Sequence, residues 1–274
     1  MARRAEEVGV AKAARSKRTL FALAVLAGAF IALGGVFASV AASGAGDAPW
    51  GFVRVLSGAT FSLGLVLVVI GGAELFTGNV LLVMAWASRR VSTRSLLRNW
   101  LVAYAGNFVG ACATAALVCL AATHELGGGA FGAYTLKTAS AKLSLTFSQA
   151  LVRGVLCNAL VCLAVWLTYS ARTTGDKIAA IVMPVAAFVA AGFEHSVANM
   201  YFVPLALFVK AWDPAFVAGA GLQGEAASLS WDAFLWRNLL PVTIGNILGG
   251  AVLVGATYWF VYMGAHRDRG GHRP

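Results

Sequence analysis

The sequence predicts an all-α integral membrane protein with six transmembrane helices, and three observations support this fold class. Of its 274 residues, 59% are hydrophobic and only 12% are charged, about half the charged fraction of an average soluble domain. The charges gather in short segments between long uncharged stretches, and the two halves of the chain carry matching motifs. These features exclude an ordinary soluble domain. Despite a net charge of +10, they give no support to nucleic-acid binding.

Each predicted span is an uncharged stretch long enough, alone or with its interrupted partner, to cross about 30 Å of hydrocarbon. The first has no small-residue cleavage site and is too long for the core of a signal peptide, so we expect it to be retained. The second and fifth are interrupted by Glu74 and by Glu194-His195. The six spans, with the interrupted ones given as pairs, are 20–42, 55–73 with 75–88, 100–123, 154–171, 178–193 with 196–209, and 238–265.

The basic residues predict the orientation. Six precede the first span, four lie between the second and third, two lie between the fourth and fifth, and three follow the sixth. This places 15 of the 21 Lys and Arg residues on one side, which the positive-inside rule identifies as the cytoplasm. We therefore expect a transmembrane domain at 20–265 with both termini cytoplasmic. Residues 1–19 would form a short basic amphipathic helix or tail near anionic lipid, and 266–274 a second tail.

An internal repeat relates the two halves. Segments 72–79 and 192–199 both read Gly-x-Glu-x-x-x-x-Asn, and segments 98–110 and 237–249 both read Arg-Asn-x6-Gly-Asn-x2-Gly. Because each half contributes three spans, the second copy must enter the membrane from the opposite side, which gives inverted-topology repeats. The offset between copies rises from 120 to 139 residues, which fits a longer loop at about 211–236.

The interruptions predict two broken helices with a substrate pathway between them near the membrane midplane. Non-helical backbone at that depth is tolerated only where it is buried in protein or lines a cavity, and the helix ends offer N–H groups that can receive an anion. The repeated Glu74/Asn79 and Glu194/Asn199 pairs fall at these breaks. We interpret Glu74 and Asn79 as structural residues of the first break, where Glu74 would accept hydrogen bonds from the exposed amides of its own helix, and Glu194 as a pathway residue.

His195 has no counterpart in the first half, where Leu75 takes its place, so the repeat does not explain it. Burial favours a neutral imidazole, whereas a nearby carboxylate such as Glu194 favours the protonated form. That balance suits proton donation to a weak-acid anion, which then avoids most of the penalty of crossing as a charge. Thr77 in the first break is expected either to face His195 or to bind back to its own helix.

Other residues within the spans receive simpler interpretations. Asn107 and Asn246 are expected to form interhelical hydrogen bonds, and the Gly pairs that flank each of them are expected to serve close packing. The four cysteines have no metal-type spacing and no neighbouring histidine, so neither a disulfide framework, a zinc site nor another cofactor is predicted.

Three segments resemble the formate/nitrite transporter family, and the match covers nearly the whole chain. They are Glu74-Leu-Phe-Thr-Gly-Asn79, Gly192-Phe-Glu-His-Ser-Val-Ala-Asn-Met200 and Asn238-Leu-Leu-Pro-Val-Thr-Ile-Gly-Asn-Ile-Leu-Gly-Gly250. Segment 5–13 is similar to the family's N-terminal cytoplasmic helix. The resemblance implies a homopentamer of six-span protomers with an aquaporin-like architecture, in which each protomer has its own pore.

The resemblance also implies roles for residues at matching positions. His195 matches the central pore histidine, Thr77 the threonine that faces it, and Lys142 an extracytoplasmic lysine that draws in anions; from the residues alone Lys142 is a solvated loop charge. The polar positions that support the site are Glu194, Asn199, Asn158 and Asn246. The apolar constrictions on either side of the histidine fall at Phe61, Leu65, Phe76 and Phe188.

Members of this family divide among formate, nitrite, hydrosulfide and lactate. Segments 59–65 and 182–263 look like those of formate channels, whereas Thr77-Gly78-Asn79 stands where such channels often have Thr-Ser-Thr. We therefore expect a channel or transporter in the inner membrane for small monovalent weak-acid anions, with formate first and nitrite or hydrosulfide as alternatives. Transient protonation at His195 would aid passage.

The sequence features also have to be weighed against a neutral-solute pore and a membrane enzyme. Inverted three-span repeats also suit a neutral-solute pore of the aquaporin type, but the Asn-Pro-Ala triplet of both aquaporin halves is missing. A membrane enzyme is disfavoured because the spans contain no metal-spaced His/Cys/carboxylate cluster, and His124, His266 and His272 lie in a loop or in the tail.

Overall fold

The computed structural model describes residues 1–264, and within that range every regular element is a helix. Residue 265 and the predicted tail at 266–274, with His266 and His272, lie outside the described residues. Five of the described helices are long and apolar enough to cross a membrane: α2 (Lys17–Ala42), α3 (Trp50–Gly71), α6 (Thr93–Leu120), α8 (Phe147–Thr168) and a final helix over Ala233–Gly264.

The final helix alternates between π and α segments. Its parts are η3 (Ala233–Leu239), α13 (Leu240–Ile247), η4 (Leu248–Ala256), α14 (Thr257–Trp259) and η5 (Phe260–Gly264).

The predicted second and fifth spans are both broken. α3 ends at Gly71, and after a short extended segment the chain resumes helically as α4 (Phe76–Asn79), η1 (Val80–Leu82) and α5 (Val83–Ala87). Similarly, α9 (Thr174–Ala190) and α10 (Ser196–Trp212) are separate helices. Gly72 and Gly192 begin the two turns with φ of +74° and +72°, a conformation that glycine adopts without steric cost. The repeated Gly of the sequence motif therefore marks the point at which each helix stops.

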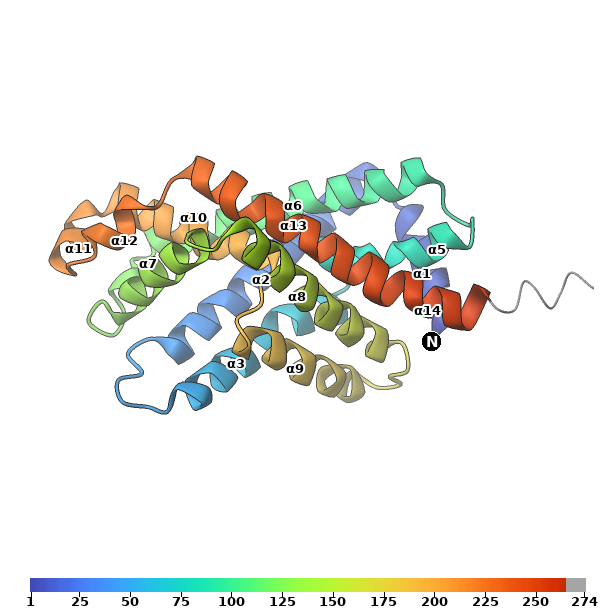
Figure 1. Cartoon of the computed structure of the whole chain (residues 1–274), viewed down its shortest axis with the longest axis horizontal. Coiled ribbons are helices and arrows are strands. Elements are labelled where there is room, and N and C mark those ends of the chain that lie inside the picture. The colour runs from blue at the N-terminus through green and yellow to red at the C-terminus, as the bar shows by residue number, and fades with distance from the viewer. Residues whose placement is uncertain (265–274) are drawn as a thin grey trace, which may run out of the picture.

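The two halves are arranged as inverted copies. The α2–α3 and α8–α9 hairpins open in opposite directions, and α5 and α10 lie toward opposite ends of the molecule (Figure 1). The repeat extends further toward the N-terminus than the motifs indicate, because α1 (Ala2–Ala13) precedes α2 as α7 (Ala130–Leu143) precedes α8. We call the two ends of the molecule the α1 side and the α7 side.

The longer loop of the second half is partly helical. It contains α11 (Pro214–Gly219) and α12 (Gln223–Ala227), which lie beside α7 (Figure 1). A 3-10 turn, η2 (Thr123–Glu125), connects α6 to this end of the molecule. There His124 Nε2 bonds Asp213 Oδ2 at 3.0 Å, and Asp213 Oδ1 accepts from the Phe216 amide at the start of α11.

Several helices begin earlier than the uncharged stretches predict. α6 begins at Thr93 and α8 at Phe147, about two turns before the expected starts at 100 and 154. Arg98 and Arg153 interrupt the uncharged runs but not the helices, because the long stem of an arginine can lie along the helix while its charge reaches a polar region. Another difference is Lys142, which lies in α7 rather than in a loop.

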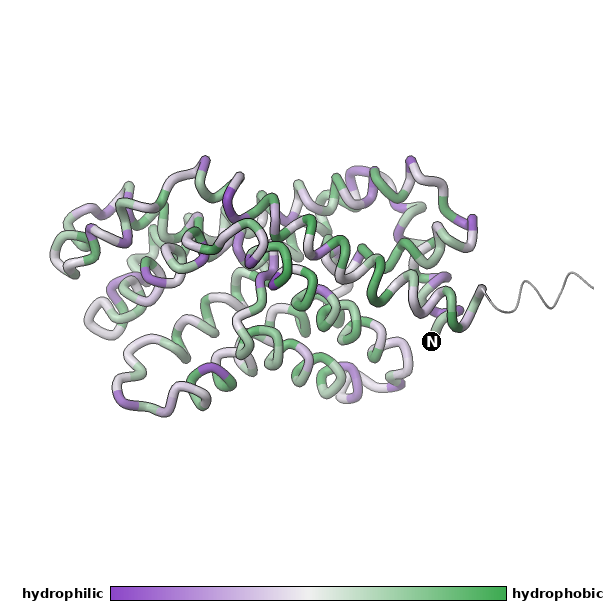
Figure 2. Tube along the Cα trace, viewed as in Figure 1, coloured by the Kyte–Doolittle hydropathy of each residue, from purple (hydrophilic) through white to green (hydrophobic). Residues whose placement is uncertain are grey.

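Hydrophobic residues cover the middle of the molecule, whereas hydrophilic residues concentrate toward its ends, its loops and the two breaks (Figure 2). The helices pack closely inside this layer. A Cβ atom at Gly110 would overlap the carbonyl of Val25, and a Cβ atom at Gly249 would overlap the carbonyl of Val155. The predicted packing role of these glycines is confirmed, and the same contact recurs in both halves.

Candidate functional site

The two breaks bring His195 and Thr77 together at the centre of the molecule. Their Nε2 and Oγ1 atoms lie 2.9 Å apart, and both side chains are buried. His195 is the N-cap of α10, and its Nδ1 accepts a hydrogen bond from the Ala198 amide at 3.0 Å. Since Nδ1 is an acceptor, the neutral imidazole carries its proton on Nε2 and donates it to the Thr77 hydroxyl. The hydroxyl is left free to donate to an anion.

Aromatic rings surround His195 on the α7 side. Phe188 stacks on the imidazole with ring centroids 5.9 Å apart, and Phe61 meets Phe188 edge-on at 6.0 Å. Phe202, which the sequence interpretation did not include, stacks on Phe61 at 6.4 Å. All three rings line a cavity of about 240 Å³ that also contains His195 and Lys142.

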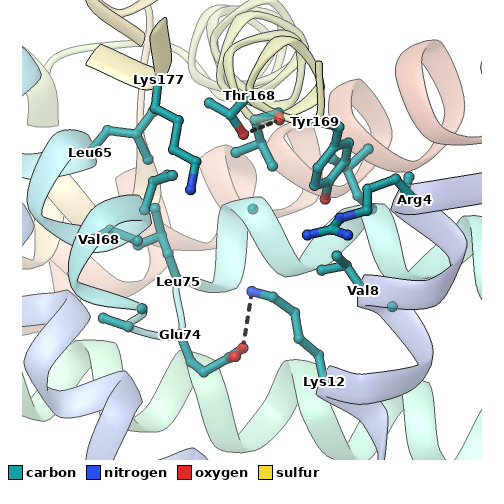
Figure 3. Close-up of a pocket in the computed structure, with 18 of the residues that line it drawn as sticks. Arg4, Val8, Lys12, Leu65, Val68, Glu74, Leu75, Thr168, Tyr169 and Lys177 are labelled. Carbon is teal, nitrogen blue, oxygen red and sulfur yellow. Dashed lines mark hydrogen bonds and ion pairs between the residues drawn. The ribbon is translucent and has the colours of Figure 1, made fainter. Parts of the chain in front are cut away.

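A larger cavity of about 650 Å³ approaches the first break from the α1 side (Figure 3). Leu65 and Leu75 line it, together with Glu74 and Lys12. Phe76, which was expected at a constriction, instead packs edge-on against Tyr104 with centroids 4.9 Å apart and lines neither cavity. The apolar lining next to the first break thus includes Leu65 and Leu75.

A polar cluster holds the second break on the α7 side. The Lys142 ammonium donates to Glu194 Oε1 at 2.9 Å, and the Asn199 amide donates to Glu194 Oε2 at 2.7 Å. Asn238 accepts from Asn199 at 2.7 Å and donates to the Lys142 carbonyl at 3.1 Å. The Asn238 amide also donates to Glu194 Oε2 at 3.3 Å, so the Glu194 carboxylate is bound by Lys142 and two side-chain amides rather than by the His195 ring.

The same cluster recurs at the first break on the α1 side. Lys12 lies 3.3 Å from Glu74 Oε2, and the Asn79 amide donates to that oxygen at 2.6 Å. Asn99 accepts from Asn79 at 2.9 Å and donates to the Lys12 carbonyl at 3.2 Å. A second cation, Arg15, contacts Glu74 Oε1 at 2.6 Å, whereas the position related by the repeat is Leu145.

Lys12 lies in α1, outside the membrane-spanning helices. Burial lowers the pKa of its ammonium group, and the Glu74 carboxylate opposes that shift. The ammonium therefore lies in a partly desolvated site whose charge Glu74 balances.

The backbone amides of Phe76 and Ser196, at the two breaks, donate to asparagine side chains rather than to the carboxylates of Glu74 and Glu194. Asn107 Oδ1 accepts from the Phe76 amide at 2.8 Å, and Asn246 Oδ1 accepts from the Ser196 amide at 2.9 Å. Their side-chain amides donate to the carbonyls of Glu74 and Glu194, both at 3.0 Å. The expected amide-binding role of Glu74 is therefore wrong.

Asn158 is a further asymmetric residue at the site. Its side-chain amide donates to the Thr77 carbonyl at 3.2 Å and to the Asn246 carbonyl at 2.7 Å. The residue 130 positions earlier, at the offset that relates α1 to α7, is Gly28. Asn158 and His195 thus both lack a polar counterpart in the first half, and both contact Thr77.

Several site residues were missed from the sequence. Lys12 is the clearest, since Ala11-Lys12 and Ala141-Lys142 stand 130 residues apart, each four residues before a helix N-cap. The other missed contributors are Asn99, Asn238, Leu75 and Phe202. The repeated Arg-Asn motif contains Asn99 and Asn238. The sequence alone does not show that their side chains contact Asn79 and Asn199 at the breaks.

Among the described residues, one group of three side chains could hold a metal ion: His124, Glu125 and Asp213. It lies on the α7 side, where the His124–Asp213 bond ties η2 to α11. Because Asp213 also caps α11, a structural role accounts for the pair.

The chain is similar to known proteins over most of its length. The family model described as Formate/nitrite transporter matches residues 1–260. The formate channel FocA of Escherichia coli K12 is 45% identical over 265 residues, covering 96% of this chain and 93% of the relative. FocA of Haemophilus influenzae is 40% identical over 253 residues, covering 92% and 89%.

Solved structures give a similar result. A pentameric formate channel with formate bound superposes with a TM-score of 0.85 at 44% identity, covering 90% of this chain and 98% of that chain. An ion channel of the same family superposes with a TM-score of 0.80 at 27% identity, covering 95% and 98%.

Proposed function

Because the chain belongs to the formate/nitrite transporter family, we propose that it is a membrane channel for formate. The relatives named as formate channels and the structure solved with formate bound support this substrate. The observation that carries the proposal is the Thr77–His195 contact, which places two hydrogen-bonding groups between cavities that open toward opposite sides of the molecule.

Lys142 attracts the anion to the cavity on the α7 side. The Phe61, Phe188 and Phe202 rings then exclude water, so that an anion loses its hydration before it reaches His195. A bare charge is costly in such a passage. Hydrogen bonds from Thr77 and His195 replace part of the lost hydration, and Leu65 and Leu75 form the apolar boundary toward the α1 side.

Protonation of the anion depends on the cap of α10. A fully protonated imidazole has donors on both ring nitrogens, so it must give up the bond from the Ala198 amide to Nδ1. That bond favours neutral His195, whereas an arriving formate favours the imidazolium. We propose that the arriving anion tips this balance: the His195 ring takes up a proton from water and becomes the imidazolium. Nε2 then passes its proton to the Thr77 oxygen while the Thr77 hydroxyl proton passes to formate, which leaves the ring neutral with its proton on Nδ1. The ring recovers its resting form by losing the Nδ1 proton and regaining one on Nε2 from water. The protonated formate crosses the second constriction as formic acid.

The protein acts in the inner membrane as a homopentamer, with one pore in each protomer. The pentameric formate channel supports this assembly. The α1 side faces the cytoplasm together with both termini, as the distribution of basic residues predicts, and membrane lipid surrounds the exposed apolar helices.

Uptake into proteoliposomes tests the function. Rapid formate flux that rises with acidity is expected, with nitrite or hydrosulfide carried more slowly. Nitrite flux well above formate flux would replace the proposed substrate by another of the same family. Fast osmotic water flux without anion flux would instead support a neutral-solute pore.

A further inference from the structure

The cavity on the α1 side is much larger than formate requires. Its volume of about 650 Å³ lies within the range of pockets for drug-sized ligands, roughly 300–1,000 Å³. The corresponding cavity on the α7 side, which receives the same small anion in the proposed function, is about 240 Å³. Passage of a one-carbon acid therefore does not account for the size of the larger cavity.

The cavity also carries more positive charge than its acidic group balances. Glu74 is the acidic residue of its lining. The five cations that line it are Arg4, Lys12, Arg15, Arg172 and Lys177. Lys12 and Arg15 already contact Glu74. The side-chain charges of Arg4, Arg172 and Lys177 form no ion pair with a carboxylate among the described residues, although the Arg172 backbone N–H donates to Asp176. Arg4 and Lys12 from α1 and Lys177 from α9 point into the same space (Figure 3).

Arg54, Lys142 and Arg153 also outnumber Glu194 in the α7-side cavity, but the inverted repeat does not explain the positions of Arg4 and Lys177. Lys12 has its counterpart in Lys142, but Arg4 corresponds to Tyr134 at the offset of 130 residues. Lys177 corresponds to Ser57 at the offset of 120 residues. The positive-inside rule accounts for basic residues on this side, yet it does not require that two distant segments, α1 with the turn after it and the α8–α9 loop with the first turn of α9, direct them into one cavity.

We propose that this cavity binds a soluble organic phosphate that carries at least two phosphate groups and that the bound molecule blocks the pore. Arginine forks match phosphate oxygens, and lysine adds a mobile point charge. The Tyr169 hydroxyl, which lies beside Arg4 at the edge of the cavity, offers a further donor (Figure 3). An occupant would lie directly over Leu75 and Glu74 and so close the α1 side. The proposed phosphate binding is inferred from the cavity alone, whereas the proposed blocking of the pore also depends on the proposed formate function.

Binding of pyrophosphate and ATP to the full-length protein in neutral-lipid nanodiscs, measured by calorimetry, tests the site. We expect binding in wild type and a loss of affinity of about tenfold or more in Lys177→Gln and in Arg4→Gln, because each removes a charged hydrogen-bond donor. Arg94→Gln is the matched control, since it removes an exposed cation from α6 outside the cavity. It should bind both probes like wild type.

Formate flux provides the second measurement. Pyrophosphate on the α1 side should slow wild-type flux and leave the Lys177→Gln/Arg4→Gln variant unaffected. Absence of pyrophosphate and ATP binding, or equal weakening by Arg94→Gln, would overturn the proposal. So would displacement of both probes by phosphatidylglycerol, since the occupant would then be a lipid headgroup. Binding without any formate flux would contradict the proposed function but not the site.

Discussion

The Nε2 atom of His195 lies 2.9 Å from the hydroxyl of Thr77, although the two residues are 118 positions apart and lie at different helix breaks. The ring's other nitrogen accepts from the Ala198 amide and caps α10. One imidazole thus links the local structure of its helix to the chemistry of the pathway. A substitution that removes the ring alters both, so the two roles must be separated experimentally.

His195→Asn separates the cap from the titration. Asparagine is a favourable N-cap and does not ionise, so we expect this variant to assemble and to lose the acid dependence of formate flux. His195→Phe removes the cap as well and should show the same flat pH profile with lower thermal stability. Proteoliposome uptake at several pH values checks both variants. A wild-type pH profile in His195→Asn would contradict the proton relay.

Asn246→Ala should destabilise the second break. The substitution removes the acceptor of the Ser196 amide and the donor to the carbonyls of Gly154 and Glu194. Buried groups left without partners cost about 2 kcal/mol in total, given the modest value of single hydrogen bonds in membranes. Thermal unfolding in detergent measures the loss.

Asn107→Ala is the matched comparison, because its three bonds are the repeat-related equivalents. The two variants should lose similar stability. A loss confined to one of them would show that the breaks depend on different contacts.

Gly249→Ala should also lower stability, for a steric reason. The new methyl group would overlap the Val155 carbonyl, and overpacking of this kind typically costs about 1–3 kcal/mol. Gly224→Ala is the control, since nothing lies within 4 Å of its Cβ position and alanine favours a helix. If both variants melt at the wild-type temperature, the final helix and α8 are less closely packed than the structure indicates.

Asp213 contributes to the stability of the folded α7 side in a way that depends on pH. The Phe216 amide and the His124 ring hold the pKa of this carboxyl below its ordinary value. A carboxyl with a depressed folded-state pKa stabilises the protein above its unfolded-state pKa, and that contribution is lost as the pH falls through the folded-state value. Asp213→Asn should therefore be less stable than wild type at neutral pH, and the difference should shrink in acid. Hydrogen exchange of α7 and α11 between pH 3 and 7 measures this. A constant difference across that range would rule out the ionised carboxylate as the cause.

The sequence predicted much of this fold because its strongest signals are local. The uncharged stretches, the Gly-x-Glu motifs and the inverted repeat require no knowledge of side-chain directions. The breaks fall where they indicate, and the helices do so apart from their earlier starts. The partners of Glu74 depend on where α1 lies, and a 12-residue polar helix carries no hydropathy signal that could place it. Phe76 shows the same limit, because one residue of rotation at a break decides whether Leu75 or Phe76 faces the cavity.

Lys142→Gln tests the capture of the anion. With the charge removed, formate uptake at low ionic strength should fall several-fold, and it should depend less on added salt, because salt screens the attraction between Lys142 and an anion that approaches from solution. Lys137→Gln is the matched control, since it removes an exposed cation from the same helix, outside the cavity. Lys142→Arg should retain most of the flux. Glu194 loses its cation in Lys142→Gln, so the double variant Lys142→Gln/Glu194→Gln keeps the test valid if the single variant fails to assemble. Equal loss of flux in Lys137→Gln would assign the effect to the overall charge of α7 rather than to Lys142.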